Sequence, residues 1–236
     1  MRPESLAARP TFHGLPIERR TLIVAGHAYE ILTLKDAADL LDVPEFGRRF
    51  LENNVAPYGL ELWPGAVMLA EFVAGGEPGA GREAIEIGCG LGLTAIVATR
   101  RGWRVTAADN DENALQFAAC NAGLNGTGIY RFETLDWNLP PDGKRFDRVF
   151  GADVLYQLED QPRIAACVDR LLSPDGVALF ADPNRGVADR FADAARVAGF
   201  HVAVIPTIAA ISADRTISGR IFRLARGPRS GKIGPA

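Results

Sequence analysis

The chain has 236 residues, of which 47% are hydrophobic, so it can bury a sizeable core in one large domain or two small ones. Its 29 acidic and 26 basic residues give a formal net charge of −3 without a long block of one sign, which argues against a surface that neutralises the phosphates of duplex nucleic acid. Three scattered cysteines without Cys-x-x-Cys spacing indicate neither a disulfide framework nor a zinc site. We therefore expect a cytoplasmic protein that makes no stable complex with nucleic acid or a membrane and holds no metal.

The first part of the chain, residues 1–56, predicts an accessory extension and not a second domain. Residues 1–20 carry prolines and arginines without clear periodicity, and we expect a loose arm there. Two short strands follow over residues 21–24 and 29–32, with His27 in the turn between them. Residues 35–50 predict one or two short helices interrupted at Pro44.

From residue 57 to 226, strands and helices alternate as in a parallel α/β sheet, and we expect one main domain there. A turn leads into an apolar helix that Pro64 opens. Strands are expected at residues 84–87, 103–108, 129–132, 148–152, 177–181, 200–205 and 216–224. Helices are expected near residues 93–101, 111–123, 162–172 and 191–198, with a Ser-Pro-Asp-Gly turn at 173–176 ending the third of these. Residues 227–236 are expected to form a flexible, solvated tail.

A glycine-rich turn follows the strand that contains Glu86. Gly88, Gly90 and Gly92 stand at alternate positions, and an apolar helix comes next. Glycines let the backbone turn at positive φ and let a ligand lie against bare main chain, while the N–H groups at the start of a helix favour an anion. Read from Gly90, the pattern Gly-x-Gly-x-x-Ala with Asp109 about twenty residues further on is typical of a dinucleotide site. The alternative without a ligand is a turn that only closes a strand–helix corner.

Read from Glu86, the pattern acid-x-Gly-x-Gly-x-Gly resembles the first motif of the seven-strand, class I S-adenosylmethionine-dependent methyltransferases. The resemblance implies a doubly wound, mostly parallel, Rossmann-like seven-stranded sheet whose last strand runs antiparallel. It implies S-adenosylmethionine as the cofactor, with Glu86 near the amino group of the methionine moiety and the three glycines against the cofactor. Asp109 stands at the position of the family's second acid, which binds the ribose hydroxyls. Asn110 beside it is included in the predicted cofactor site.

A second resemblance narrows the family. Leu62-Trp63-Pro64, an Ala-x-x-Leu-Ala helix and the glycine motif are similar to methyltransferase family 16, which contains many protein-lysine methyltransferases. In that group the tryptophan, here Trp63, lies beside the cofactor, whereas the alternative is a residue that fills the core. Asp153 and Tyr156 form the Asp-x-x-Tyr pattern that follows the fourth strand in the family's lysine methyltransferases. Proline is absent from both middle positions, which favours an aliphatic amine over a planar amide as acceptor.

Ligands of open α/β sheets lie outside the carboxyl ends of the strands, where further polar and aromatic residues stand. The family places a polar residue against the adenine amino group and an apolar one on the ring, here Asp136 and Trp137. A carboxylate accepts from the amino group and an indole covers the ring, but Trp137 alternatively caps the edge of the sheet. Ala152 completes the predicted cofactor site. Arg185 is either at the acceptor entrance or a surface residue.

These motifs predict an S-adenosylmethionine-dependent methyltransferase that N-methylates a lysine side chain of a protein. Transfer from a sulfonium is an in-line displacement, which depends on alignment of the reacting atoms. Asp153 and Tyr156 are the predicted catalytic residues: Asp153 attracts and orients the ammonium, and Tyr156 shapes the channel. For Asp153 the alternative is a cap of the following helix. Other functions left open are methyl transfer to a small-molecule amine or hydroxyl, NAD-dependent oxidoreduction, and cofactor binding without turnover in an interaction module.

Overall fold

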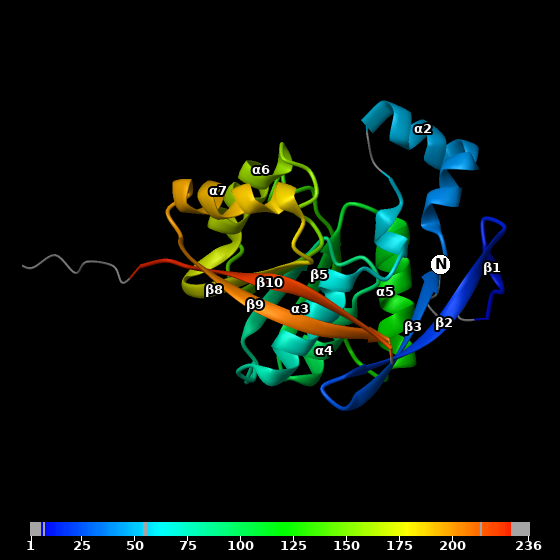
Figure 1. Ribbon diagram of the computed structural model, residues 1–236, viewed down its shortest axis with the longest axis horizontal. Coiled ribbons are helices and arrows are strands. Elements are labelled where there is room, and N and C mark those ends of the chain that lie inside the picture. Colours follow the sequence, from blue (N-terminus) through cyan, green and yellow to red (C-terminus); the bar gives the residue numbers. More distant parts are fainter. Residues whose placement is uncertain (1–5, 7, 54–55, 213, 228–236) are drawn as a thin grey trace, which may run out of the picture.

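The fold was analysed in a computed structural model, which describes residues 6, 8–53, 56–212 and 214–227. Its centre is a seven-stranded sheet in the order β6-β5-β4-β7-β8-β10-β9 (Figure 1). The strands are β4 (Glu83–Ile87), β5 (Arg104–Asp109), β6 (Arg131–Thr134), β7 (Phe146–Ala152), β8 (Leu172–Asp182), β9 (His201–Ser212) and β10 (Arg215–Ala225). The first five strands in this order, β6, β5, β4, β7 and β8, are parallel, and β10 runs antiparallel to both of its neighbours, β8 and β9. The predicted fold class is therefore confirmed.

Helices cover both faces of this sheet, as expected of a doubly wound fold. They are α3 (Pro64–Gly75), α4 (Leu93–Arg100), α5 (Glu112–Leu124), α6 (Asp160–Leu171) and α7 (Phe191–Val197), with a short 3-10 helix, η3 (Gly186–Arg190), before α7. Buried residues of α3, α4 and α5 belong to one hydrophobic core, and those of α6 and α7 to a second. In Figure 1, α6 and α7 lie on one side of the sheet, and α3 and α4 lie on the other.

The strands and helices fall close to the predicted ones, but several strands of the main domain begin or end elsewhere. Strand β9, expected to end at residue 205, continues to Ser212. Strand β6 begins at Arg131, two residues later than expected. Strand β8 begins at Leu172, so the predicted Ser-Pro-Asp-Gly turn lies within the strand. The pairing of β8 with β7 changes register between Phe146 and Arg148, which accommodates these extra residues.

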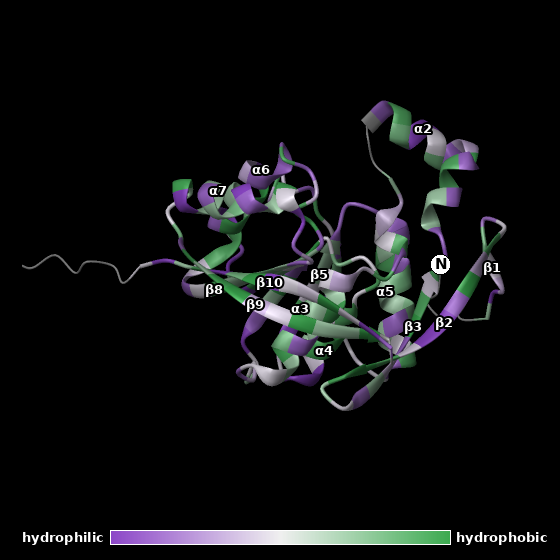
Figure 2. Cartoon of the chain, viewed as in Figure 1, coloured by the Kyte–Doolittle hydropathy of each residue, from purple (hydrophilic) through white to green (hydrophobic). Residues whose placement is uncertain are grey.

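Among its described residues, the N-terminal part forms a small antiparallel sheet and three short helical segments. The sheet consists of β1 (Thr11–Phe12), β2 (Leu15–Val24) and β3 (His27–Leu34), and the helical segments are η1 (Ala37–Asp42), α2 (Pro44–Asn53) and η2 (Tyr58–Leu60). Pro44 begins α2, as predicted. Figure 2 shows a hydrophilic stretch along β2, which contains Glu18, Arg19 and Arg20 in succession, whereas α3 and α4 are mostly hydrophobic.

The expected loose arm over residues 1–20 is wrong for residues 11–12 and 15–20, which belong to β1 and β2. Polar residues here form cross-strand pairs: Nε of Arg19 lies 2.6 Å from Oε2 of Glu30 on β3. A hydrophobic pattern does not reveal such pairs. His27 is the first residue of β3 and not part of the turn. Residues 1–5 and 7 of the arm and 228–236 of the predicted tail lie outside the described residues.

Two asparagines, Asn121 of α5 and Asn125 directly after it, attach the N-terminal sheet to the main domain. Asn121 is fully buried; its Oδ1 accepts from the backbone N of Leu32 at 2.7 Å, and its Nδ2 donates to the backbone O of Leu32 at 3.1 Å. Asn125, one turn later, makes the same two contacts with Glu30. Side-chain amides thus satisfy backbone groups of β3 as a neighbouring strand would. Asn121 Nδ2 also donates to the backbone O of Leu91 in the glycine loop at 3.0 Å.

Replacing Asn121 by alanine is expected to lower the free energy of unfolding by about 3 kcal/mol, because it leaves buried backbone groups of β3 and of the glycine loop without partners. Urea unfolding followed by circular dichroism measures this loss. Gln116 lies on the same helix and is half-buried, so Gln116→Ala is a matched control, expected to change stability by less than about 0.5 kcal/mol. Equal losses in the two variants would contradict the anchoring role.

The described residues contain no helix that is both long enough and apolar enough to span a membrane.

Candidate active site

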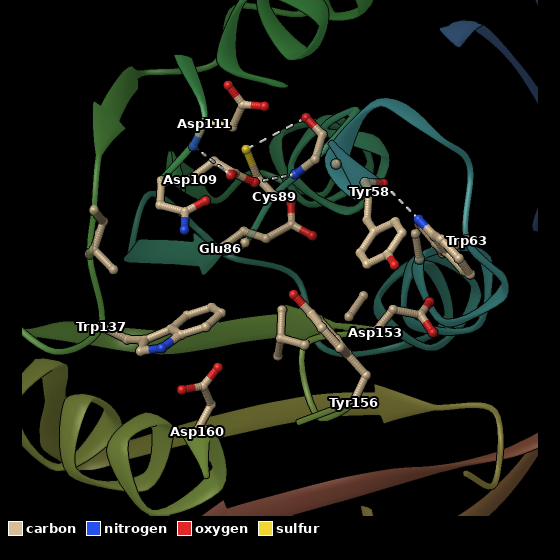
Figure 3. A pocket seen from close by; sticks show the side chains of 18 of the residues that line it. Tyr58, Trp63, Glu86, Cys89, Asp109, Asp111, Trp137, Asp153, Tyr156 and Asp160 are labelled. Carbon is tan, nitrogen blue, oxygen red and sulfur yellow. Dashed lines mark hydrogen bonds between the residues drawn. The ribbon is translucent and has the colours of Figure 1, made fainter. Parts of the chain in front are cut away.

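One cavity of about 1120 Å³ opens at the carboxyl ends of strands β4 to β7. This volume slightly exceeds the roughly 300–1,000 Å³ of small-molecule sites, so the cavity has room for a cofactor and part of an acceptor. All twelve predicted site residues line it: Trp63, Glu86, Gly88, Gly90, Gly92, Asp109, Asn110, Asp136, Trp137, Ala152, Asp153 and Tyr156. Figure 3 shows side chains from opposite walls of this cavity.

The glycine loop forms the floor of the cavity at the end of β4. Gly88, Gly90 and Gly92 have φ angles of 64°, 49° and 79°, which are left-handed conformations that favour glycine. A Cβ atom on Gly88 would lie 2.6 Å from Cγ1 of Val154, and one on Gly92 would lie 2.9 Å from Cβ of Ala118. Side chains are therefore excluded at these positions by both backbone conformation and space. The main chain of the loop is left bare beside the N-terminus of α4.

Two buried carboxylates hold this loop from either side. Oε2 of Glu86 accepts from the backbone N of Ala95 in the first turn of α4 at 2.8 Å. Oδ2 of Asp109 accepts from the backbone N of Gly90 at 2.9 Å, and Oδ1 accepts from the backbone N of Asp111 at 3.0 Å. Figure 3 shows both acids beside the loop, facing the same cavity. The predicted arrangement of Glu86 and Asp109 around one glycine-lined site is therefore present.

Burial makes these two acids weaker than usual. Desolvation raises the pKa of Glu86 to about 8 and the pKa of Asp109 to about 6. Backbone hydrogen bonds from Ala95 to Glu86, and from Asp111 and Gly90 to Asp109, oppose this rise but do not cancel it. At pH 7, Glu86 is then mostly protonated and Asp109 mostly ionised. A cation placed against Glu86 would favour its ionised form and release a proton.

The raised pKa of Glu86 predicts a pH dependence of stability. The folded protein binds this proton more tightly than the unfolded chain, whose glutamate pKa is near 4.5. The stabilisation is therefore complete below pH 4.5 and is lost as the pH rises through about 8. Glu86→Gln removes the titration, so relative to wild type the variant should gain several kcal/mol of stability between pH 5 and 8. Urea unfolding at both pH values measures this difference, and a constant difference would contradict the raised pKa.

The predicted adenine side of the cavity follows β6. Trp137 is partly buried and packs against the second hydrophobic core while lining the cavity. Asp136 is exposed, and its Oδ1 accepts from the backbone N of Asn138 at 2.8 Å and from the Nδ2 of Asn138 at 2.7 Å. Asn110 is exposed on the cavity wall after β5. These side chains meet in one cavity, and their contacts with adenine remain predictions.

Asp153 has two protein partners that the sequence did not indicate. It has a positive φ of 58° and is buried. Its Oδ2 accepts from the backbone N of Gly65 at 2.5 Å, and its Oδ1 pairs with Nη1 of Arg185 at 2.5 Å. A Cβ atom on Gly65 would clash with Oδ2, so the contact depends on glycine. Asp153 therefore binds the start of α3, not the following helix that was the alternative. Burial raises its pKa, whereas Arg185 opposes the rise.

Three aromatic side chains, Tyr58, Trp63 and Tyr156, lie together on one wall of the cavity (Figure 3). Tyr58 lies between Trp63 and Tyr156, with ring centroids 5.9 Å and 6.0 Å away and nearly perpendicular planes. Nε1 of Trp63 donates to the backbone O of Tyr58 at 2.7 Å, which fixes the indole. Tyr156 is 40% exposed, so it stands at the cavity mouth. The sequence analysis did not include Tyr58 in the site, because Tyr58 lies in η2 and not at the end of a strand. Its position in the turn before Trp63 is the sequence feature that could have indicated it.

Residues 85–180 match the family model described as a methyltransferase domain. Residues 85–180 therefore belong to a methyltransferase domain. This confirms the resemblance inferred from the glycine motif, and it favours methyl transfer over the dinucleotide interpretation. The fold also matches solved structures. A methyltransferase from Pyrococcus furiosus has a TM-score of 0.56 and 17% identity, and the match covers 80% of this chain and 98% of that one. A TehB-like SAM-dependent methyltransferase from Corynebacterium glutamicum has a TM-score of 0.51 and 16% identity, and the match covers 81% of this chain and 100% of that one.

Curated relatives of the methyltransferase domain differ in their acceptors. The chain is 34% identical to protein N-lysine methyltransferase METTL21A of Danio rerio, over 50% of this chain and 57% of the relative. It is also 34% identical to a ubiquinone biosynthesis O-methyltransferase of Alkalilimnicola ehrlichii, over 44% of this chain and 43% of the relative. Histone-arginine methyltransferase METTL23 of Rattus norvegicus is 30% identical, over 47% and 52%. The chain thus spans about half the length of these relatives.

Proposed function

We propose that the protein binds S-adenosylmethionine in this cavity and N-methylates a lysine side chain of a protein substrate. The observation that carries the proposal is the placement of Glu86 and Asp109 on either side of one bare glycine loop, in the cavity that also contains Asp153 and Tyr156. The similarity to a protein N-lysine methyltransferase supports the choice of acceptor.

The residues of the cavity fit this cofactor. Glu86 would hold the ammonium group of the methionine moiety, and Asp109 would accept from the ribose hydroxyls. Trp137 offers a face for adenine, and Asp136 an acceptor for its amino group. The bare main chain at Gly88, Gly90 and Gly92 allows close approach, and Trp63, Asn110 and Ala152 complete the walls. When bound, the cofactor supplies a methyl group on a positively charged sulfur.

The protein's residues would then prepare the acceptor amine. A lysine with a pKa near 10.4 is charged at pH 7, and burial beside another positive charge lowers that value. Asp153 would draw the ammonium into the cavity and orient it, and Tyr156 would shape the channel. After the proton has left to water, these residues would hold the neutral amine in line with the methyl group that a bound cofactor supplies. Alignment at about 3–3.5 Å is the main contribution of the protein.

A second candidate is methyl transfer to a small molecule. The similarity to ubiquinone biosynthesis O-methyltransferases favours it, as does a cavity large enough to enclose a small acceptor beside the cofactor. Incubation with isotope-labelled S-adenosylmethionine and cell extract separates the two candidates: label on a lysine of a protein supports the first, and label on small molecules supports the second.

Calorimetric titration tests the cofactor itself. We expect S-adenosylmethionine and its demethylated product to bind at micromolar concentrations and NAD not to bind. Tighter binding of NAD would favour an oxidoreductase. Binding of S-adenosylmethionine without label transfer in any extract would favour an interaction module.

We also propose that residues 57–226 form the methyltransferase domain and residues 1–56 an accessory extension. The separate three-stranded sheet of the extension supports this division. A cytoplasmic location is proposed from the three scattered cysteines of the sequence.

A further inference from the structure

On the proposed acceptor side of the cavity, the guanidinium of Arg185 forms an ion pair with Asp153. Nη1 of Arg185 lies 2.5 Å from Oδ1 of Asp153, whose side chain is 7% exposed. The other oxygen, Oδ2, is bound to the backbone N of Gly65 and therefore fixed to the start of α3. Oδ1 is the oxygen of Asp153 that binds a positive charge.

The surroundings of the Arg185 guanidinium are those that recognise an alkylammonium group. Its Cζ atom lies 5.8 Å from the centre of the Trp63 ring, and the carboxylate of Asp153 is in direct contact. An aromatic face and a carboxylate are the two groups that bind organic cations best. The Arg185 side chain is 27% exposed and lines the cavity, so this position is open to a ligand.

The contact between Arg185 and Asp153 is exchangeable. It uses the single nitrogen Nη1, and not the two parallel hydrogen bonds that make arginine–carboxylate pairs strong. Oδ2 of Asp182 lies 3.5 Å from the same nitrogen and offers a second carboxylate, whose other oxygen, Oδ1, accepts from Nη2 of Arg220 at 3.2 Å. The backbone N of Arg185 donates to Oδ1 of Asp182 at 2.8 Å, which keeps the two residues adjacent. The guanidinium can turn to Asp182 and release Asp153 without losing a charged partner.

We infer that Arg185 occupies the place of the acceptor's cation, and that an alkylammonium group displaces it from Asp153 onto Asp182. This inference rests on the proposed amine acceptor and deepens it. Arg185 is then a specificity-determining residue, because an acceptor must carry a positive charge to replace the guanidinium. Neutral or anionic acceptors would leave the pair between Arg185 and Asp153 intact.

Binding of n-butylammonium, a minimal analogue of a lysine side chain, tests this inference. The titration uses full-length protein saturated with S-adenosylhomocysteine at low ionic strength. Arg185→Met removes the competing charge at similar length and should bind n-butylammonium about tenfold more tightly than wild type, a difference of about 1.4 kcal/mol. Adding Asp153→Asn to this variant should abolish the gain.

Arg163→Met is the matched control. Arg163 also lines the cavity, but it pairs with Asp160 on its own helix. The control removes the same charge from the same cavity and should bind n-butylammonium within about twofold of wild type. An equal gain in both variants, or none in Arg185→Met, would overturn the inference.

A measurement on the wild-type protein does not depend on how the variants fold. The guanidinium NMR signals of Arg185, assigned by their absence in Arg185→Met or Arg185→Lys, should shift when n-butylammonium is added. Unchanged signals at saturating n-butylammonium would contradict displacement. Binding of S-adenosylhomocysteine reports separately on the proposed function: its absence would remove the methyltransferase proposal, whereas its presence with unchanged Arg185 signals would remove this inference alone.

Discussion

Asp109→Ala is expected to weaken binding of S-adenosylmethionine by a factor of about 100 or more. Two hydrogen bonds between a carboxylate and the ribose hydroxyls contribute roughly 1.5–3 kcal/mol each. The same carboxylate also accepts from the backbone N atoms of Gly90 and Asp111, so alanine removes the support of the glycine loop. Isothermal titration with S-adenosylmethionine measures the change.

Asp160→Asn is the matched control for this experiment. Asp160 lines the same cavity from α6, opposite the glycine loop (Figure 3). Its replacement should change the affinity by less than about threefold, since a carboxylate that makes no contact with the cofactor contributes only weak, solvent-screened electrostatics. Wild-type affinity in Asp109→Ala would show that the ribose lies elsewhere.

The second large effect is expected from a change at Asp153, on the rate of methyl transfer and not on the affinity for the cofactor. Asp153→Ala should lower the rate of methyl transfer by about 100-fold, because a small misplacement of reacting groups is enough for such a loss. Cofactor affinity should stay within about fivefold, since Asp153 contacts Gly65 and Arg185, whereas Glu86 and Asp109 hold the glycine loop. Single-turnover transfer of labelled methyl, together with calorimetry, separates the two quantities.

Asp153→Asn distinguishes charge from structural support. Its amide oxygen can still accept from the backbone N of Gly65, so the start of α3 is held, but the negative charge is removed. We expect Asp153→Asn to lose most of the transfer rate with an unchanged melting temperature. Full activity in Asp153→Ala would refute any role of this carboxylate in transfer.

Much of the site could be predicted because strand ends are local features. Glu86, Asp109, Trp137 and Asp153 each stand at or just after a run of strand-forming residues, and parallel strands bring such ends to one edge of the sheet. The alternation of strands and helices was enough to predict this edge. The antiparallel last strand came from the family resemblance, and the structure confirms it, whereas the order of the strands was not predicted.

The contacts that the sequence did not reveal join distant residues. Gly65 and Asp153 are 88 positions apart, and Asn121 and Leu32 are 89 apart, so no local pattern links them. The sequence allowed Arg185 to lie either at the surface or at the acceptor entrance, and only the structure reveals its ion pair with Asp153. The first part of β2, residues 15–20, was mistaken for a loose arm because its run of charged residues, one of which pairs across the strands with Glu30, leaves no hydrophobic periodicity.

A crystal structure of the complex with S-adenosylhomocysteine tests the central claim most directly, since it locates both ends of the ligand. The account predicts the amino group within hydrogen-bond distance of the Glu86 carboxylate and both ribose hydroxyls within about 3.2 Å of Asp109, with the main chain of the glycine loop between them. A ligand bound outside this cavity, or with its ribose away from Asp109, would contradict it.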